Sequence, residues 1–324
     1  MHADAFDLAI VGAGPCGLAV AIAAGKAGLR AVVFDRGPIV NGITNYPTYM
    51  TFFSTADRIS IGGLPFIVPM DKPSKRDAMA YYRAVADHFA LDVRQYERVD
   101  RLARTDCWHV HTTRLTGASG VTRARAVAVA TGYFGRPNQL GVPGESLPHV
   151  RHGYADGHFA WHQQVVVIGG GNSAVDAALD MCRAGGDVTI VHFADSLDPN
   201  IKPWVRPEIE ARIREGRIGA IYGARVTEIG ADFVTVRDVS GERSIPASQV
   251  YTMTGYLPET GLLEQTGVPI DAETGVPMHD PLTMATPEPG LYLAGVIASG
   301  LRANRIFIEN GRDHGELIVA HLVR

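Results

Sequence analysis

Two glycine-rich segments carry the residue types and spacing that bind phosphate. The first is AIVGAGPCGLA, beginning at Ala9, and the second is VVVIGGGNSAVDAA, beginning at Val165. Each follows an apolar stretch and precedes a helical pattern, so its glycines allow a tight turn, close approach of a pyrophosphate and packing of the helix on its strand. The start of the helix adds backbone amides and the positive end of its dipole. Two such segments predict two bound dinucleotides.

The elements around the first turn form a complete strand-helix-strand unit. We expect a strand at DLAIVGAG, a helix over residues 15–27 and a strand at RAVVFD that ends at Asp35. A carboxylate at this position accepts hydrogen bonds from the ribose hydroxyls of an adenosine; the alternative is a solvated carboxylate at a strand end. The predicted contacts of this dinucleotide are Gly12, Gly14, Pro15, Cys16, Gly17, Asp35 and Arg36.

The second unit has the same layout but a different strand end. No acid ends the strand DVTIVHF; His192 lies there, and Lys202 and Arg206 follow in the next loop. Basic groups at this place accommodate a 2′-phosphate and favour NADPH over NADH, whereas Asp195 in the same loop is an alternative partner for a ribose. The predicted contacts of the second dinucleotide are Gly169, Gly171, Asn172, Ser173, Ala174, His192, Lys202 and Arg206.

Two similar segments flank the second unit. RAVAVATGYFGRP contains Thr131 and Gly132, and SQVYTMTGYLP contains Thr254 and Gly255. If one nucleotide domain is inserted in another, the chain must leave the first and return to it, and these segments suit the two crossings. We therefore predict an α/β fold with two Rossmann-like domains of the three-layer ββα type, covering residues 1–135 with 256–324 and residues 136–255. The alternative is that each segment is only a buried strand followed by a turn.

Composition and charge restrict the class of protein. The chain has 324 residues, 46% hydrophobic and 20% charged, with a net charge of -4. This predicts a globular two-domain protein without an electrostatic grip on nucleic acid. The apolar stretches are too short to span a membrane and the N-terminus lacks a secretory pattern, so we expect no membrane contact and a cytoplasmic location. The three cysteines form no CxxC pair, and no metal site is expected.

The order of these parts resembles the low-molecular-weight thioredoxin reductases over nearly the whole chain, except that the redox CxxC of that family is missing. Finer strings are similar to the YpdA-type bacillithiol disulfide reductases; they are GPCGLA, NYPTYMTFFSTADRISIGG, AYYR, IKPW, LAGVIASG and FIENGRDHG. This resemblance implies FAD at the first turn, NADPH at the second, bacillithiol disulfide as the small-molecule substrate, and a homodimer or homotetramer.

The resemblance also implies further cofactor contacts. Residues 45–63 are similar to the region beside the isoalloxazine ring, and the TG segments lie against the cofactors. In LAGVIASG, Gly295 approaches the flavin and Val296 stands where the family has a ribityl-binding aspartate. A helix over residues 305–322 begins near the flavin ring. The added FAD contacts are Pro47, Thr48, Phe53, Thr131, Gly132, Gly295, Val296 and Ile306, and the added NADPH contacts are Thr254 and Gly255.

Cys16 is the candidate catalytic residue. It lies in the first turn of a helix, where the helix dipole lowers a thiol pKa and the pyrophosphate charge opposes this. Cys16 would attack the substrate disulfide and form a mixed disulfide; the alternative is a small residue that only packs. Cys107 and Cys182 are expected to be buried small hydrophobes. Two other functions stay open: a ferredoxin or flavodoxin NADP reductase, and a non-catalytic nucleotide-sensing module.

Overall fold

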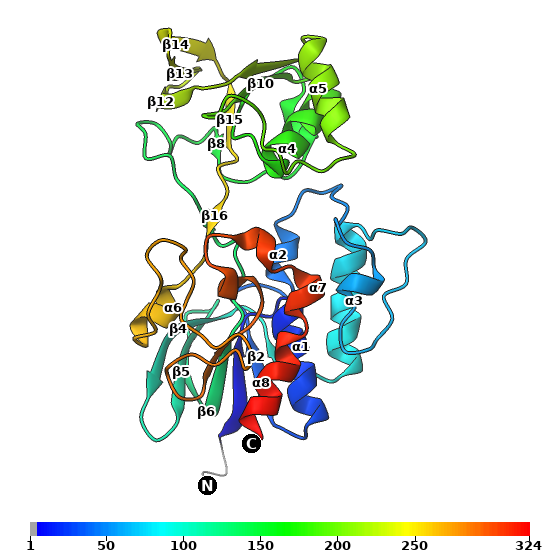
Figure 1. The fold of residues 1–324 in the computed structure, drawn as a ribbon, viewed down its shortest axis with the longest axis vertical. Coiled ribbons are helices and arrows are strands. Elements are labelled where there is room, and N and C mark those ends of the chain that lie inside the picture. The colour runs from blue at the N-terminus through cyan, green and yellow to red at the C-terminus, as the bar shows by residue number, and fades with distance from the viewer. Residues whose placement is uncertain (1–4) are drawn as a thin grey trace. The chain divides into compact units, whose positions relative to one another are not determined.

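The computed structural model describes residues 5–324, which form two compact units (Figure 1). Unit 1 contains residues 5–136 and Leu257–Arg324, and unit 2 contains Pro137–Tyr256. These limits differ by one residue from those expected from the TG segments. The chain crosses between the units through β7 (Arg136–Pro137) and β16 (Tyr256–Leu257), which pair with each other. The α/β fold with one Rossmann-like unit inserted in the other is confirmed.

Unit 1 is built on a seven-stranded sheet. Its elements are β1 (Phe6–Val11), α1 (Pro15–Lys26), β2 (Ala31–Phe34), α2 (Asn41–Thr44), η1 (Asp57–Ile59), α3 (Lys75–His88), β3 (Val93–Arg94), β4 (Glu97–Arg104), β5 (Trp108–Arg114), β6 (Ser119–Val129), α6 (Gly261–Gln265), β17 (Leu291–Leu293), η3 (Gly295–Ser299), η4 (Ala303–Arg305), α7 (Ile308–Gly311) and α8 (His314–Leu322). The strand order is β3-β2-β1-β6-β5-β4, with β17 also paired with β6. The pairs of β1 with β2 and β6 are parallel, which puts the ends of β1, β2 and β6 at one edge.

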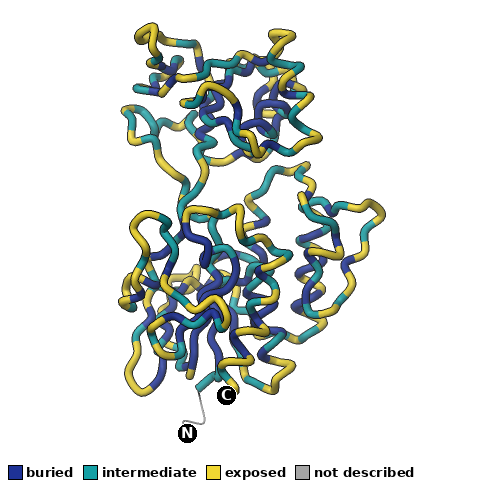
Figure 2. Tube along the Cα trace, viewed as in Figure 1, coloured by how far each residue is buried: buried dark blue, intermediate teal, exposed yellow. Residues whose placement is uncertain are grey.

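Helix α1 is held between the sheet and α8. Proline is favourable at the start of a helix because its missing N–H would be unpaired there, and Pro15 opens α1. The helix is apolar and buried from Gly17 to Ile22 (Figure 2). Its neighbour α8 comes so close at Gly315 that a methyl group there would lie 2.8 Å from the Ala19 carbonyl oxygen. This packing fixes the first glycine turn at the edge of the sheet.

The expectation of a single C-terminal helix over residues 305–322 is wrong. The structure has η4, then the short α7, then α8. The Asn310 side chain causes part of the break, because it accepts from the backbone N–H of Phe307 and donates to the carbonyl oxygen of Arg305. The break also separates Gly311, which packs beside Cys16, from the glycine of α8 that packs on α1.

Unit 2 contains a five-stranded parallel sheet and a three-stranded antiparallel sheet. Its elements are β8 (Val150–Arg151), η2 (Gly157–Ala160), β9 (Gln164–Ile168), α4 (Asn172–Arg183), β10 (Asp187–Val191), α5 (Arg206–Arg214), β11 (Ile218–Ile221), β12 (Arg225–Ile229), β13 (Phe233–Asp238), β14 (Gly241–Pro246) and β15 (Gln249–Thr252). The orders are β11-β10-β9-β15-β8 and β12-β13-β14. The central strands β9 and β10 are nearly continuous runs of buried Val and Ile, as parallel strands covered on both faces require.

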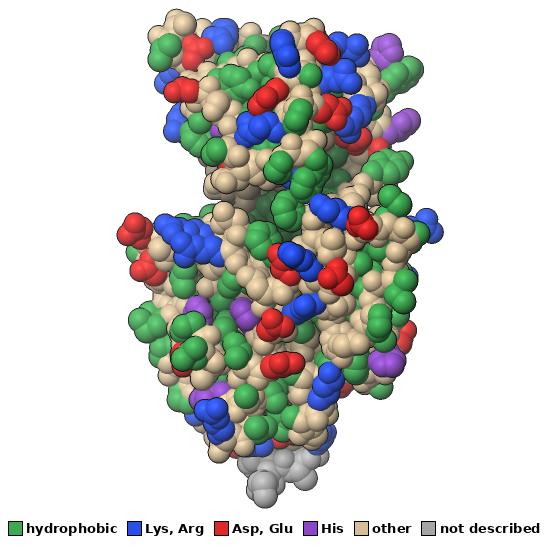
Figure 3. Space-filling model, turned by 45° about the vertical axis from the view of Figure 1, so that its right-hand side comes forward, with side chains coloured by type: hydrophobic (Ala, Val, Ile, Leu, Met, Phe, Trp, Pro, Cys, Tyr) green, Lys and Arg blue, Asp and Glu red, His purple; other side chains and the backbone are tan. Residues whose placement is uncertain are grey.

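The surface carries charges of both signs. On the face shown in Figure 3, acidic and basic side chains are interspersed over each unit. Within residues 5–324, no helix is both long and apolar enough to cross a bilayer.

Candidate cofactor-binding sites

The first glycine turn leaves open space where a phosphate would approach. Gly12 has a φ of 112°, and a methyl group on it would lie 2.3 Å from the Ala130 carbonyl oxygen. A methyl group on Gly17 would lie 2.0 Å from the Gly12 oxygen, so both positions demand glycine for packing. Gly14, the residue before α1, is different: a methyl group there meets no atom within 4 Å. The space beside Gly14 and the free amides of the helix start suit a pyrophosphate.

Asp35 ties the end of β2 to the first turn. One carboxylate oxygen accepts from the N–H of Ala13 at 2.8 Å and the other from the N–H of Gly37 at 2.9 Å. Burial raises the pKa of Asp35, and the two hydrogen bonds oppose that rise. Each oxygen keeps a further lone pair for a ribose hydroxyl. Arg36 is exposed and pairs with Glu259 at 3.0 Å.

The first TG segment supplies an unpaired buried hydroxyl. Thr131 Oγ1 is buried and has no hydrogen-bond partner among residues 5–324. The segment lies next to the first turn: a methyl group added to Gly12 would be 3.3 Å from the backbone nitrogen of Thr131. A methyl group on Gly132 meets no atom within 4 Å. An orphaned hydroxyl beside two open glycines fits a cofactor with polar groups, and these residues are therefore compatible with FAD.

The loop expected beside the flavin ring is only partly explained. Pro47 is half-buried and Thr48 is exposed. Phe53 has 59% of its side chain exposed and lies 5.3 Å from the Lys72 ammonium. Among the described residues, no hydrogen bond, ion pair or ring contact joins these three residues to the first turn.

An aromatic pair that the sequence reasoning missed links this loop to the TG segment. The rings of Tyr46 and Phe134 contact each other edge to face, with 5.5 Å between their centres. Phe134 is the second residue after Gly132 in the chain. The position of Phe134 behind a TG turn was the available signal.

Cys16 is packed against the C-terminal segment. A methyl group on Gly295 or on Gly311 would lie 2.9 Å from Cys16 Sγ. Burial, and to a smaller extent the charge of Asp313, raises the pKa of the Cys16 thiol to about 12. The net direction is opposite to the lowering that a helix start favours, because burial disfavours the charged thiolate.

His314 is a further residue of this site that the sequence reasoning missed. Its Nδ1 accepts the N–H of Gly295 at 3.1 Å, and burial lowers its pKa. The acceptor role requires Nδ1 to be unprotonated. Val296 is half-buried in η3, and its carbonyl oxygen accepts from the Ser299 hydroxyl at 2.8 Å. Ile306 also reaches this cluster, since its Cγ2 would lie 3.1 Å from a methyl group on Gly311.

The second glycine turn repeats the first in unit 2. Gly169 has a φ of 138°, and a methyl group there would lie 2.4 Å from the Met253 carbonyl oxygen. Gly171 precedes α4 and is open to solvent space. Ala174 is fully buried, as the helix packing requires, and Ser173 is exposed. The turn can therefore admit a second pyrophosphate.

Asn172 organises the loop beyond the second turn. Its side-chain amide donates to the Asn200 carbonyl oxygen at 3.1 Å, and its side-chain oxygen accepts the N–H of Lys202 at 2.9 Å. At the far crossing, the Thr254 hydroxyl donates to the carbonyl oxygen of Asn138, and Gly255 has open space beside it.

The three basic residues expected around a 2′-phosphate are placed differently from one another. Lys202 Nζ pairs with Asp176 at 2.6 Å. Arg206 pairs with Glu210 at 3.1 Å and donates to a backbone carbonyl oxygen. His192 has 8% of its surface exposed, its ring lies under Gly170, and burial lowers its pKa.

His192 nevertheless retains a binding group. Its Nδ1 has no partner among the described residues. A buried unpaired nitrogen at the end of β10 fits a ribose hydroxyl, since the ribose lies at this strand end in dinucleotide-binding folds. The second turn is therefore compatible with a nicotinamide dinucleotide.

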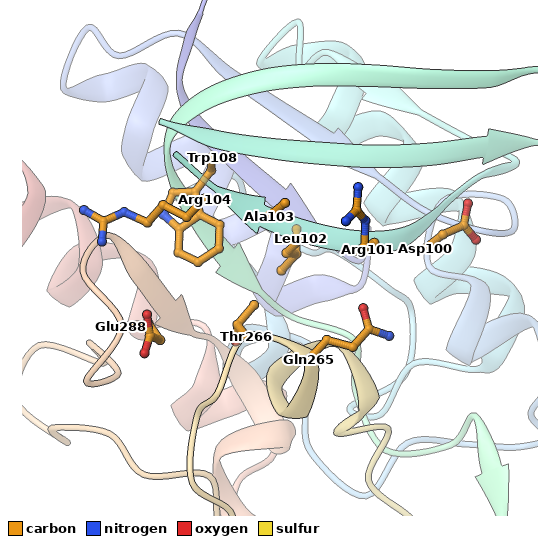
Figure 4. Close-up of a pocket in the computed structure, with 9 residues that line it drawn as sticks. All are labelled: Asp100, Arg101, Leu102, Ala103, Arg104, Trp108, Gln265, Thr266 and Glu288. Carbon is orange, nitrogen blue, oxygen red and sulfur yellow. The ribbon is translucent and has the colours of Figure 1, made fainter. Parts of the chain in front are cut away.

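A pocket of about 630 Å³ lies elsewhere in unit 1 (Figure 4). Its walls are β4, Trp108 at the start of β5, the end of α6 and Glu288. None of its lining residues belongs to either glycine turn.

A small group of possible metal ligands also lies apart from the turns. Asp106, Cys107 and His109 bring ligand atoms within 4.8 Å of one another. The guanidinium of Arg123 contacts the Cys107 sulfur at 3.4 Å and pairs with Asp106 at 2.9 Å, and its positive charge opposes a cation there.

Comparison with known proteins assigns the family. The model of the pyridine nucleotide-disulphide oxidoreductases matches residues 9–295. Bacilliredoxin reductase Bdr of Bacillus subtilis is 42% identical over 320 residues, which is 97% of each chain. The bacillithiol disulfide reductase Bdr (YpdA) of Bacillus cereus is 42% identical, with a TM-score of 0.96 and 98% of each chain covered. That of Staphylococcus aureus is 38% identical, with a TM-score of 0.94 over 99% of this chain and 98% of the other. The chain therefore belongs to the pyridine nucleotide-disulphide oxidoreductase family, as an oxidoreductase that uses FAD and NADPH.

Proposed function

We propose that this protein reduces the disulfide of bacillithiol with electrons from NADPH. The observation that carries the proposal is the similarity over 98% of the chain to a solved bacillithiol disulfide reductase. The cysteines support it, because Cys16, Cys107 and Cys182 are all free thiols. A chain without a paired dithiol suits direct reduction of a small disulfide better than exchange through a CxxC relay.

The proposal places FAD at the first turn and NADPH at the second. The FAD domain covers residues 1–135 and 256–324, and the NADPH domain covers residues 136–255. When bound, FAD would supply the two-electron chemistry that couples oxidation of NADPH to reduction of a disulfide. Gly14 admits the pyrophosphate beside the amides of α1, and the second lone pairs of Asp35 hold the ribose. The hydroxyl of Thr131, which has no partner among the described residues, would form a hydrogen bond with FAD.

Cys16 is the residue proposed to contact the disulfide. Its sulfur lies beside Gly295, which the proposal places at the flavin. With a pKa of about 12, only the small ionised fraction of Cys16 attacks at neutral pH. Reduction through Cys16 therefore increases as the pH rises. The attack breaks the substrate S–S bond, forms a mixed disulfide between Cys16 and one bacillithiol, and releases the other bacillithiol as a thiolate. The two electrons that bound FAD would supply then cleave the mixed disulfide, which releases the second bacillithiol and regenerates Cys16.

A protein acceptor is a second candidate. The Bacillus subtilis relative is named bacilliredoxin reductase, which favours the mixed disulfide of that protein as substrate. Both acceptors present a disulfide and use the same electrons. We further propose a cytoplasmic location, because free thiols persist in a reducing compartment. A homodimer or homotetramer is proposed from the resemblance to this family alone.

Separate assays with the two acceptors test the proposal. Flavin-loaded protein is mixed anaerobically with NADPH and either bacillithiol disulfide or bacilliredoxin carrying bacillithiol, and kcat/KM is compared for wild type and Cys16→Ser. We expect NADPH oxidation with bacillithiol disulfide and a loss of that activity in the variant. Exclusive turnover with bacilliredoxin would select the second candidate, and reduction of a ferredoxin or flavodoxin alone would overturn both.

A further inference from the structure

A 2′-phosphate at the second turn needs a positive charge that is not already paired. The adenosine of a dinucleotide lies beyond the carboxyl end of the strand that follows the turn and helix, and in unit 2 that strand is β10. Lys202 and Arg206 have carboxylate partners, and the buried His192 is disfavoured as a cation. The charge that meets the phosphate must come from another residue near the end of β10.

The segment after β10 runs beside the segment after β11. The N–H of His192 donates to the carbonyl oxygen of Ile221 at 2.9 Å, and the N–H of Ala224 donates to the carbonyl oxygen of His192 at 3.1 Å. Arg225 follows Ala224 directly and opens β12. This backbone pairing brings Arg225 to the end of β10, although the two segments are separated in sequence.

Phe193 and Arg225 form an exposed stacked pair. The guanidinium carbon of Arg225 lies 5.2 Å from the centre of the Phe193 ring, and 62% of Phe193 is exposed. In the described chain, Arg225 has no carboxylate partner. An aromatic face suits an adenine ring, and a guanidinium held by its stem can bind a phosphate with two parallel hydrogen bonds.

A second arginine lies opposite the first. Arg225 and Arg237 are direct partners in the antiparallel register of β12 and β13. Like charges directly opposite each other in a sheet repel, and a bound anion removes that repulsion. Arg237 is partly neutralised by Glu242 at 3.3 Å, whereas Arg225 is not. The charge of this strand pair is therefore concentrated at Arg225, beside Phe193.

We propose that Phe193 and Arg225 form the subsite for the adenosine 2′-phosphate of NADPH, an assignment that rests on the proposed place of NADPH at the second turn. Phe193 stacks on the adenine, and Arg225 binds the 2′-phosphate. The carboxylate of Asp195 opposes the binding of a 2′-phosphate in this subsite. It lies in the same region, since its Oδ1 would be 3.4 Å from a methyl group added to Gly223. Its carboxylate would favour an unphosphorylated ribose.

Equilibrium binding of two nucleotides tests the subsite without turnover. Flavin-loaded protein is titrated by calorimetry with adenosine 2′,5′-bisphosphate and with AMP, which differ by the 2′-phosphate. We expect wild type to prefer the bisphosphate. Arg225→Gln weakens the bisphosphate by about ten-fold, the loss of a charged hydrogen-bonded contact, and leaves AMP unchanged. Phe193→Ala weakens both nucleotides by a similar factor.

Matched variants separate this subsite from general charge effects. Arg217→Gln removes the same charge from an exposed residue of unit 2 that lies just before β11, away from the strand ends, and should change neither affinity. If wild type binds neither nucleotide, the assignment of NADPH to the second turn fails and the subsite with it. If wild type prefers the bisphosphate and Arg225→Gln binds it equally well, only the subsite is refuted.

Discussion

Cys16 should remain a protonated thiol through the neutral range. Its sulfur lies against Gly295 and Gly311, and burial with the charge of Asp313 raises its pKa to about 12. At pH 8 the difference is roughly four pH units, so about one molecule in ten thousand carries the thiolate. A helix start without this burial would instead place the pKa below about 8.5.

The ionisation can be read from the ultraviolet absorbance of the thiolate. Wild type and Cys16→Ser are titrated from about pH 6 to about pH 10, and the difference between the two curves isolates Cys16. We expect no midpoint in the difference curve over this range. The same titration in denaturant is the control, and there the Cys16 thiol should ionise with a midpoint of about pH 8.5.

A native midpoint below about pH 9 would refute the argument that burial outweighs the helix dipole. Asp313→Asn supplies an independent check of sign when the titration of both proteins is extended to about pH 12. Removing this carboxylate removes a charge that raises the Cys16 pKa, so the variant should ionise at lower pH than wild type. If the variant ionises at higher pH, the electrostatic reasoning is wrong.

Four further predictions concern the stability of unit 1. Gly12→Ala should lose flavin and about 3 kcal/mol of unfolding free energy, because its methyl group meets a backbone oxygen at a positive φ. Gly25→Ala, near the end of α1, should gain about 0.5–1 kcal/mol in urea unfolding, because a methyl group there meets no other atom within 4 Å. Burial lowers the pKa of His314, so the neutral side chain stabilises the fold fully above about pH 6.5. As the pH falls below that value, the free energy of unfolding should decrease by at most about 1.4 kcal/mol per pH unit. His314→Asn should make the free energy of unfolding, measured with urea, depend less on pH, and an unchanged pH dependence would contradict this. Ser74→Ala should cost about 1 kcal/mol by removing the capping box of α3, measured against wild type at constant pH.

The glycine turns could be read from the sequence because their requirements are local. Gly12 and Gly169 are needed at the ends of β1 and β9, where a strand must turn into a helix with a positive φ. The TG segments are a local signal of the same kind, and the limits expected from them differ by one residue from those of the two compact units. These features depend on neighbours in the chain and on steric rules that hold in any sequence.

The chemistry of the sites depended on contacts that the sequence does not display. Cys16 meets Gly311 only because the C-terminal segment returns to α1, and that burial reverses the expected pKa shift. Lys202 was expected to be available to a phosphate, but Asp176 on α4 lies 2.6 Å away. Arg225 went unnoticed because β12 reaches the end of β10 only through the pairing of the loops between them.

The central claim is that electrons from NADPH reach the disulfide of bacillithiol through this flavoprotein. The most direct measurement is the number of thiols released per NADPH oxidised by flavin-loaded protein under anaerobic conditions with bacillithiol disulfide as the acceptor. The account predicts two thiols for each NADPH, since a hydride carries the two electrons that cleave one disulfide. Oxidation of NADPH without release of thiol, or a purified protein that binds no flavin, would contradict it.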